Sequence, residues 1–148
     1  MAFHFSLETI FHFRKSVEHQ QKLRLRTSNQ QLARVRHLLD QLDSRIREMH
    51  ARQAQDLAAG ATAAELIFAL QCQAGMSQQR PAIERELLRL QNLRDVQQKI
   101  FHQARRDREV LESLRDSQLR DYECDQRRRE QRSLDDLFLM RQAYLRRG

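Results

Sequence analysis

The chain has 148 residues with 3 glycines, 1 proline and no tryptophan, and 32% of its residues are charged. So few turn-forming residues exclude most β folds, which need a turn every ~8–12 residues. Aromatic residues make up 6% and the mean hydropathy is −0.81, which leaves little material for a large compact core. The wealth of Arg, Gln, Glu, Leu and Ala favours long helices that bury a narrow stripe. Disorder is the competing interpretation of such polarity, and the sustained heptads described below argue against it.

The net charge of +7 is unevenly distributed. Residues 1–36 carry 7 basic and 2 acidic residues, residues 120–148 carry 8 and 6, and residues 37–119 carry 12 of each. The basic excess therefore lies near both termini. If the chain folds back on itself, the termini meet and form a basic end, which favours an acidic partner through electrostatic steering.

Residues 25–49 carry the clearest periodic pattern, with the alternating three- and four-residue spacing of a coiled-coil seam. Its two heptad series are Leu25, Leu32, Leu39 and Ile46, and Ser28, Val35, Leu42 and Met49. A first helix over residues 3–58 is predicted around this seam. Gly60 suits the left-handed position that follows a helix end.

The middle of the chain predicts a bend. Thr62 and Glu65 fit a capping box that opens a short helix over residues 62–78. Pro81 suits the first position of a new helix, predicted over residues 81–146. The expected seam of that helix is Ile83, Leu87, Leu90, Leu93, Ile100, Ala104, Leu111 and Leu114, with Gln97 and Asp107 interrupting it to loosen the packing or fix the register.

Both arms end in an apolar cluster, and both have a polar, basic stretch between that cluster and their seam. A fold-back near residues 59–80 would place Leu32–Met49 opposite Leu90–Ile100, and Phe5–Val17 opposite Leu134–Leu145. The N-terminal aromatic residues would then pack against the other terminus or, alternatively, anchor a partner. The predicted fold is thus all-α, a single domain formed by a long antiparallel two-helix coiled coil with a short helix near the bend. A parallel homodimer through the first helix is the alternative that periodicity leaves open.

The sequence contains no catalytic, cofactor-binding or metal-binding constellation, so the protein is not expected to be an enzyme or to bind a cofactor. The histidines form no i, i+4 pair, and Cys72 and Cys124 are expected to be two free thiols in a reducing compartment. The N-terminus lacks the features of a cleaved signal, and no apolar run is long enough for a membrane span. A cytosolic protein, or one exported without a cleaved signal, is expected.

Nucleic acid is the partner that a pI of about 10.4 first suggests. However, the basic residues are interleaved with Gln and Glu, and Arg127, Arg128 and Arg129 point around a helix. No aromatic stacking pattern accompanies them. Nucleic-acid binding is therefore kept as the alternative function, and nucleic acid is not the expected partner.

Several short motifs together resemble the flagellar export protein FliJ family, over nearly the whole chain. They are the opening Phe3-x-Phe5-x-Leu7-Glu8 followed by Arg14, the stretch Arg108-Glu109-Val110-Leu111-Glu112-Ser113-Leu114-Arg115, and the ending Leu134-Asp135-Asp136-Leu137 with Arg141. The family would be expected to have Leu-Asp-Glu where this chain has Leu134-Asp135-Asp136. The stalk of a virulence secretion system is a related alternative.

The resemblance implies a soluble coiled coil similar to the central stalk of rotary ATPases. It also implies a location at the cytoplasmic face of the inner-membrane export apparatus. The implied partners are an export ATPase ring of the FliI type, the cytosolic domain of an export-gate protein of the FlhA type, and export chaperones. Candidate ATPase contacts are Arg14, Lys15, Lys22, Arg24, Arg26, Leu134, Asp135, Asp136 and Leu137. Candidate gate contacts are Leu38, Leu42, Arg45 and Met49, although Leu42 and Met49 also fit a purely structural role in the seam.

Overall fold

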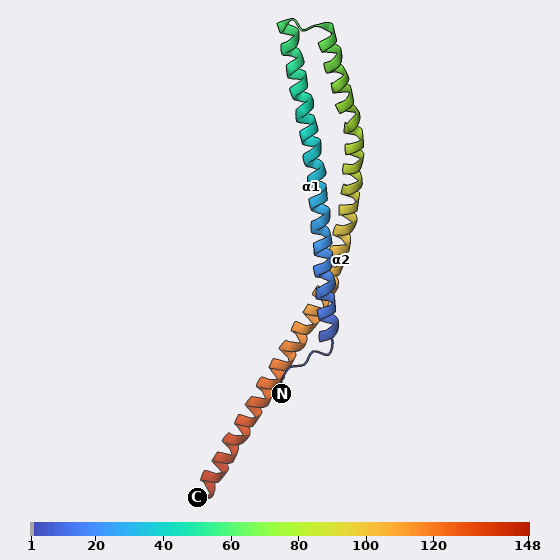
Figure 1. Cartoon of the computed structure of the whole chain (residues 1–148). Coiled ribbons are helices and arrows are strands. Elements are labelled where there is room, and N and C mark those ends of the chain that lie inside the picture. The colour runs from blue at the N-terminus through green and yellow to red at the C-terminus, as the bar shows by residue number, and fades with distance from the viewer. Residues whose placement is uncertain (1) are drawn as a thin grey trace. The chain divides into compact units, whose positions relative to one another are not determined.

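A computed structural model describes residues 2–148 and contains two helices (Figure 1). Helix α1 spans Glu8–Ala59 and helix α2 spans Ala63–Arg147. The chain divides into two compact units: a terminal unit, formed by the residues up to Glu18 together with Gln103–Gly148, and a central unit, His19–His102. The two long helices pack against each other within each unit, and all regular structure in the described residues is helical. The all-α, two-helix prediction is therefore confirmed.

The turn between the helices is built by local hydrogen bonds. Gly60 has φ of 83°, a left-handed conformation that costs glycine little. The Ala61 amide donates to Asp56 O at 2.9 Å and the Gly60 amide donates to Leu57 O at 3.4 Å, which is the Schellman pattern. The Thr62 amide then donates to Glu65 Oε2 at 3.2 Å, and the Glu65 amide donates to Thr62 Oγ1 at 3.3 Å. Both the helix end and the capping box predicted from the sequence are confirmed.

The predicted short helix at the bend is not a separate element, because α2 is continuous from Ala63 and includes Pro81. A proline inside a helix removes one backbone hydrogen bond and crowds the preceding turn. The neighbouring Arg80 forms a two-pronged contact across the hairpin, with Nε to Asp43 Oδ1 at 2.8 Å and Nη2 to Asp43 Oδ2 at 3.4 Å. Tertiary contacts of this kind can hold a helix through a proline that would end it locally.

In the central unit, the predicted seam of α1 is confirmed. All eight of its residues are buried or half-buried, and the exposed fractions of Leu32 and Leu42 are 2% and 6%. The seam is covered by α2 of the same chain in an antiparallel arrangement, with Asp43 contacting Arg80 and His50 contacting Gln73. The apolar stripe therefore finds its cover within one chain, without the parallel partner that the alternative needed.

The predicted seam of α2 is correct at Ile83, Leu87, Leu90, Ala104 and Leu111 and wrong at three positions beyond Leu90. Leu93, Ile100 and Leu114 are exposed, at 48%, 44% and 39%. The positions that continue the heptad phase set by Ile83, Leu87 and Leu90 are buried or half-buried instead, and they are Arg94, Gln97, Phe101, Ala104, Arg108, Leu111 and Arg115. Polar residues occupy this seam because they find partners in it. In the central unit, Gln97 Nε2 donates to Gln21 Oε1 at 2.7 Å, which fixes the register as its position suggests.

The terminal unit pairs the start of α1 with residues 104–122 of α2. Arg115 Nε lies 3.4 Å from Glu8 Oε2, and the rings of Phe3 and Tyr122 are 5.7 Å apart. Phe11 is 1% exposed. Two cations flank its ring, with Lys15 Nζ at 4.8 Å and Arg115 Cζ at 5.5 Å from its centroid. Phe5 is also buried, at 3%, whereas Phe13 is 61% exposed. Phe11 thus packs beside Arg115 of α2 and Phe5 is buried, whereas the packing predicted for Phe13 is not observed.

The predicted pairing of Phe5–Val17 with Leu134–Leu145 is wrong. The turn lies at Gly60–Thr62 rather than in the middle of residues 59–80, and α1 has 52 residues against 85 in α2. In an antiparallel hairpin, the numbers of two facing residues add up to twice the number at the centre of the turn. Moving the turn by one residue along the chain therefore changes the partner of any given residue by two positions. Within the terminal unit, α2 therefore continues past the start of α1 (Figure 1), and residues 127–148 are all exposed.

Two other kinds of site are absent from residues 2–148. No group of three or more histidine, cysteine or acidic side chains in this range is placed to hold a metal ion. None of the helices described combines the length and apolar character that a membrane span requires. Cys72 and Cys124 are free thiols.

Candidate interaction surfaces

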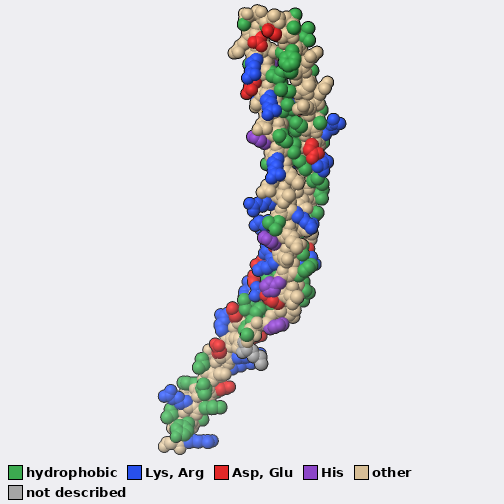
Figure 2. Space-filling view, viewed as in Figure 1, with side chains coloured by type: hydrophobic (Ala, Val, Ile, Leu, Met, Phe, Trp, Pro, Cys, Tyr) green, Lys and Arg blue, Asp and Glu red, His purple; other side chains and the backbone are tan. Residues whose placement is uncertain are grey.

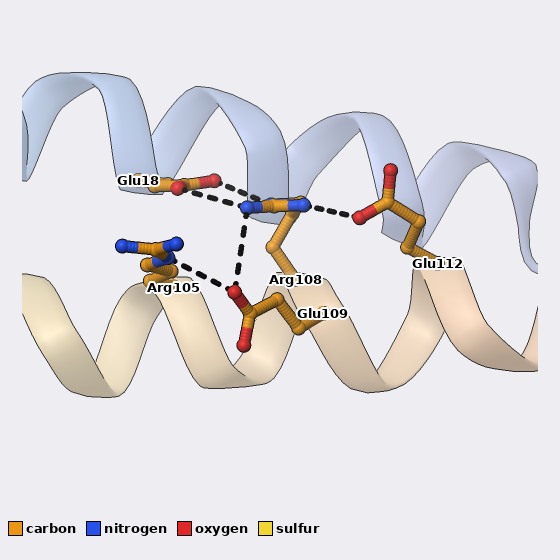
Figure 3. Close-up of polar contacts among 5 residues, drawn as sticks. All are labelled: Glu18, Arg105, Arg108, Glu109 and Glu112. Atoms are coloured by element: carbon orange, nitrogen blue, oxygen red, sulfur yellow. Dashed lines mark hydrogen bonds and ion pairs between the residues drawn. The ribbon is translucent and has the colours of Figure 1, made fainter.

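The most connected polar site in the terminal unit centres on Arg108 (Figure 3). Arg108 occupies a seam position of α2 and is 18% exposed, and its partner Glu18 on α1 is 19% exposed. Arg108 Nε donates to Glu18 Oε2 at 2.7 Å and Nη2 donates to Glu18 Oε1 at 3.2 Å. Nη1 contacts Glu112, and Nη2 lies 3.9 Å from Glu109 Oε1. One guanidinium thus joins the two helices where the heptad would otherwise place an apolar residue.

The charges around Arg108 keep it ionised. The hydrogen bond with Glu18 raises the pKa of Arg108 above its ordinary value, against the opposing effect of burial, and the charges of Glu112 and Glu109 add to the rise. The guanidinium is therefore positive at every pH at which the protein is handled. Two-pronged pairs of this kind fix geometry as well as contributing energy, so the site specifies how α1 and α2 align in the terminal unit.

Arg108→Ala is expected to destabilise the protein by about 1–2 kcal/mol, between the ~0.2–1 kcal/mol of exposed ion pairs and the ~3–5 kcal/mol of broken buried ones. The cause is Glu18, which stays partly desolvated without its partner. The double variant Glu18→Met/Arg108→Met should recover much of the loss, because it leaves no unpaired charge. Urea unfolding followed by circular dichroism measures both.

The matched control for this prediction is Arg105→Ala. Its ion pair with Glu109 is exposed, at 52% and 46%, so a change below about 0.5 kcal/mol is expected. A double methionine variant as unstable as Arg108→Ala would show that the ion pair itself, rather than relief of a stranded charge, stabilises the seam.

The five basic candidates for the ATPase contact have different surroundings. In the terminal unit, Arg14 Nη1 lies 3.4 Å from Asp107 Oδ2, and Lys15 lies over the Phe11 ring. In the central unit, Lys22 and Arg26 line a groove, whereas Arg24 is exposed outside it. The candidates in the terminal unit are thus engaged within the fold, and Lys22, Arg24 and Arg26 are exposed on α1.

The remaining ATPase candidates lie on the exposed C-terminal part of α2. Leu134 and Leu137 are 61% and 62% exposed, and Asp135 Oδ1 accepts a hydrogen bond from Gln131 at 2.9 Å. At about 100° per residue, Leu134, Leu137 and Phe138 share one face of the helix. Figure 2 shows hydrophobic side chains gathered on this segment beside Lys and Arg side chains. None of the described residues of the terminal unit covers this apolar face.

The four gate candidates do not form a single exposed stripe. Leu38 is 54% exposed and Arg45 is exposed, whereas Met49 is half-buried and Leu42 is buried in the seam. Leu42 reaches a partner only if the two helices of the central unit separate. The structural role of Leu42 in the seam is confirmed.

The sequence analysis missed both Arg108 and the groove beside Lys22. The signal for Arg108 was present, because counting by alternating threes and fours from Leu90 leads to Gln97, Phe101, Ala104 and Arg108. Leu93 and Ile100 are apolar and directly precede two seam positions. The seam was therefore assigned to them instead of to the residues that follow them. The groove had no comparable signal, since it forms only where α1 and α2 meet.

The geometry defines a class of protein: an antiparallel two-helix coiled coil with polar seam positions and an uncovered C-terminal helix. The chain belongs to the flagellar FliJ protein family, whose model matches residues 3–148. It is accordingly a non-enzymatic component related to flagellar protein export. No curated protein and no solved structure matches the chain significantly.

Proposed function

We propose that the chain is a stalk-like component of the flagellar type III export apparatus. Its terminal unit would insert into a ring of the FliI-type export ATPase. The protein would also contact the cytosolic domain of the FlhA-type export gate and handle export chaperones. It would work in the cytoplasm, held at the inner face of the membrane by these partners.

The observation that carries the proposal is the C-terminal part of α2. A single exposed helix with Leu134, Leu137 and Phe138 on one face needs an apolar surface to cover it. In the central unit, the exposed basic residues Lys22, Arg24 and Arg26 of α1 favour an acidic partner surface. In a family tied to flagellar export, a ring that encloses the C-terminal helix would supply the apolar surface that this helix needs.

The experiment that tests the proposal measures ATP hydrolysis by the purified export ATPase with and without the full chain, together with a pull-down in which heparin competes. We expect stimulation and heparin-resistant capture. Arg24→Glu/Arg26→Glu should weaken capture about tenfold, because it reverses two exposed charges, and should leave the melting temperature unchanged. Steeply salt-dependent binding to DNA, with no effect on the ATPase, would overturn the proposal in favour of nucleic-acid binding.

A further inference from the structure

The groove in the central unit is lined by both apolar and basic residues. It has a volume of about 640 Å³ and is lined on α1 by residues from His19 to Ala33, with Phe101 contributed by α2. Leu23, Leu25 and Phe101 supply apolar surface, and Lys22 and Arg26 stand among them. Leu23 is 49% exposed although it is a large aliphatic residue. The surface is thus apolar enough to bind a side chain and charged enough to select one.

The shape of the groove matches a third helix. Its lining residues on α1 include Lys22, Leu23, Arg26 and Gln30, which recur at three- and four-residue spacing and so share one face. From His19 to Ala33 this face is about 21 Å long at ~1.5 Å per residue, which is four turns of helix. Amphipathic helices bind such grooves through apolar anchors at the same spacing.

The charge of the groove selects the sign of its partner. Residues 19–39 carry five basic and no acidic residues, and residues 96–102 carry one basic and no acidic residue. A second copy of the chain would bring further positive charge, since the net charge is +7 and the exposed C-terminal part of α2 is itself rich in arginine. Like charges facing each other oppose association, whereas a partner carrying Glu or Asp is favoured.

We propose that this groove is a docking site for an acidic amphipathic helix of a partner protein. The leucine-type side chains of that helix would pack on Leu23 and Phe101, and its carboxylates would pair with Lys22 and Arg26. The inference deepens the proposed function, on which it rests for the identity of the partner, by naming the kind of segment that the basic face of α1 binds. Arg24, outside the groove, would take no part in it.

The test is fluorescence anisotropy on the full-length protein with a synthetic probe. The probe is a labelled amphipathic helix of about 18 residues, with leucine at positions i, i+4, i+7 and i+11 and glutamate on its polar face. Its twin carries lysine in place of glutamate. The acidic probe should bind at least about tenfold more tightly than the twin, and its affinity should fall as salt is added. Equal binding of the two probes, or binding of neither, would overturn the inference.

Matched variants locate the binding on the surface. Lys22→Glu/Arg26→Glu should lower the affinity for the acidic probe about tenfold. Arg24→Glu/Arg36→Glu changes the charge of the same helix by the same amount and should lower the affinity less than about twofold. Leu23→Ser should also weaken it, whereas Leu38→Ser, at a similarly exposed position outside the groove, should not. If both charge-reversal variants, or both Leu→Ser variants, lowered the affinity equally, the assignment of probe binding to the groove would be overturned. A random DNA duplex that binds more tightly than the probe, and is weakened by the same groove variants, would assign the groove to nucleic acid instead.

These measurements use no export ATPase, so the two proposals can fail separately. Probe binding without ATPase stimulation would retain the groove and remove the proposed stalk function. ATPase stimulation without probe binding would retain the proposed stalk function and remove the groove as a docking site.

Discussion

Leu32→Asp is expected to unfold the central unit, with a loss of stability of about 4 kcal/mol or more. Leu32 is 2% exposed in the seam between α1 and α2. The substitution removes a buried aliphatic side chain, which costs about 2–5 kcal/mol, and places a carboxylate at a position shielded from water. Domains of this size are stable by only about 5–15 kcal/mol. Helicity at 222 nm, followed during heating and urea unfolding, measures the effect.

The matched control is Leu38→Asp on the same helix. Leu38 is 54% exposed, so a change of no more than about 0.5–1 kcal/mol is expected from the same chemical substitution. A similar melting temperature for the two variants would show that the seam is not the core of the protein in solution.

Leu134→Gln/Phe138→Gln is expected to abolish most of the stimulation of the export ATPase, by about tenfold or more, while the protein stays folded. Both residues are 61% exposed among residues 2–148, so the free energy of unfolding should change by less than about 0.5 kcal/mol. In the proposed complex the same side chains become buried anchors, where such losses reach about 2 kcal/mol or more. Steady-state ATP hydrolysis and a melting curve are measured on the same preparation.

The control for this second prediction is Leu139→Gln/Ala143→Gln. These residues have the same i, i+4 spacing in the same segment and lie on the opposite face of the helix, at about 100° per residue. Their replacement should leave stimulation within about twofold of the original protein. Equal losses for both variants would show that the segment acts through its helicity or charge rather than through one apolar face.

Local chemistry made much of the fold predictable. The seam from Leu25 to Met49 was visible because seven of its eight heptad positions, all but Ser28, are apolar. The turn was visible because Gly60 and the pair Thr62 and Glu65 act over a few residues. In each case the physical cause, a stripe that must be covered or an amide that needs a partner, lies within one short stretch.

Features that depend on two distant stretches were misjudged. Pro81 predicts a helix boundary on its own, yet α2 continues through it beside the Arg80–Asp43 contact. Leu93 and Ile100 were predicted to be seam residues, yet the seam passes through the neighbouring positions Arg94 and Phe101. Further along the same seam, Gln97 pairs with Gln21 and Arg108 pairs with Glu18. A polar residue can occupy a seam only when its partner lies opposite, and that partner is set by the register of the other helix.

The sequence by itself determined that this protein is helical, that its helices pair along a narrow seam, and that its closing turn is built from Gly60, Thr62 and Glu65. It also carried the family resemblance. Only the tertiary structure decided where each helix meets the other. A turn at Gly60–Thr62 joins arms of unequal length, so the apolar residues from Leu134 to Leu145 lie past the start of α1. The same register brings Phe101 beside Lys22 and Arg26, and so decides which exposed residues are available to a partner.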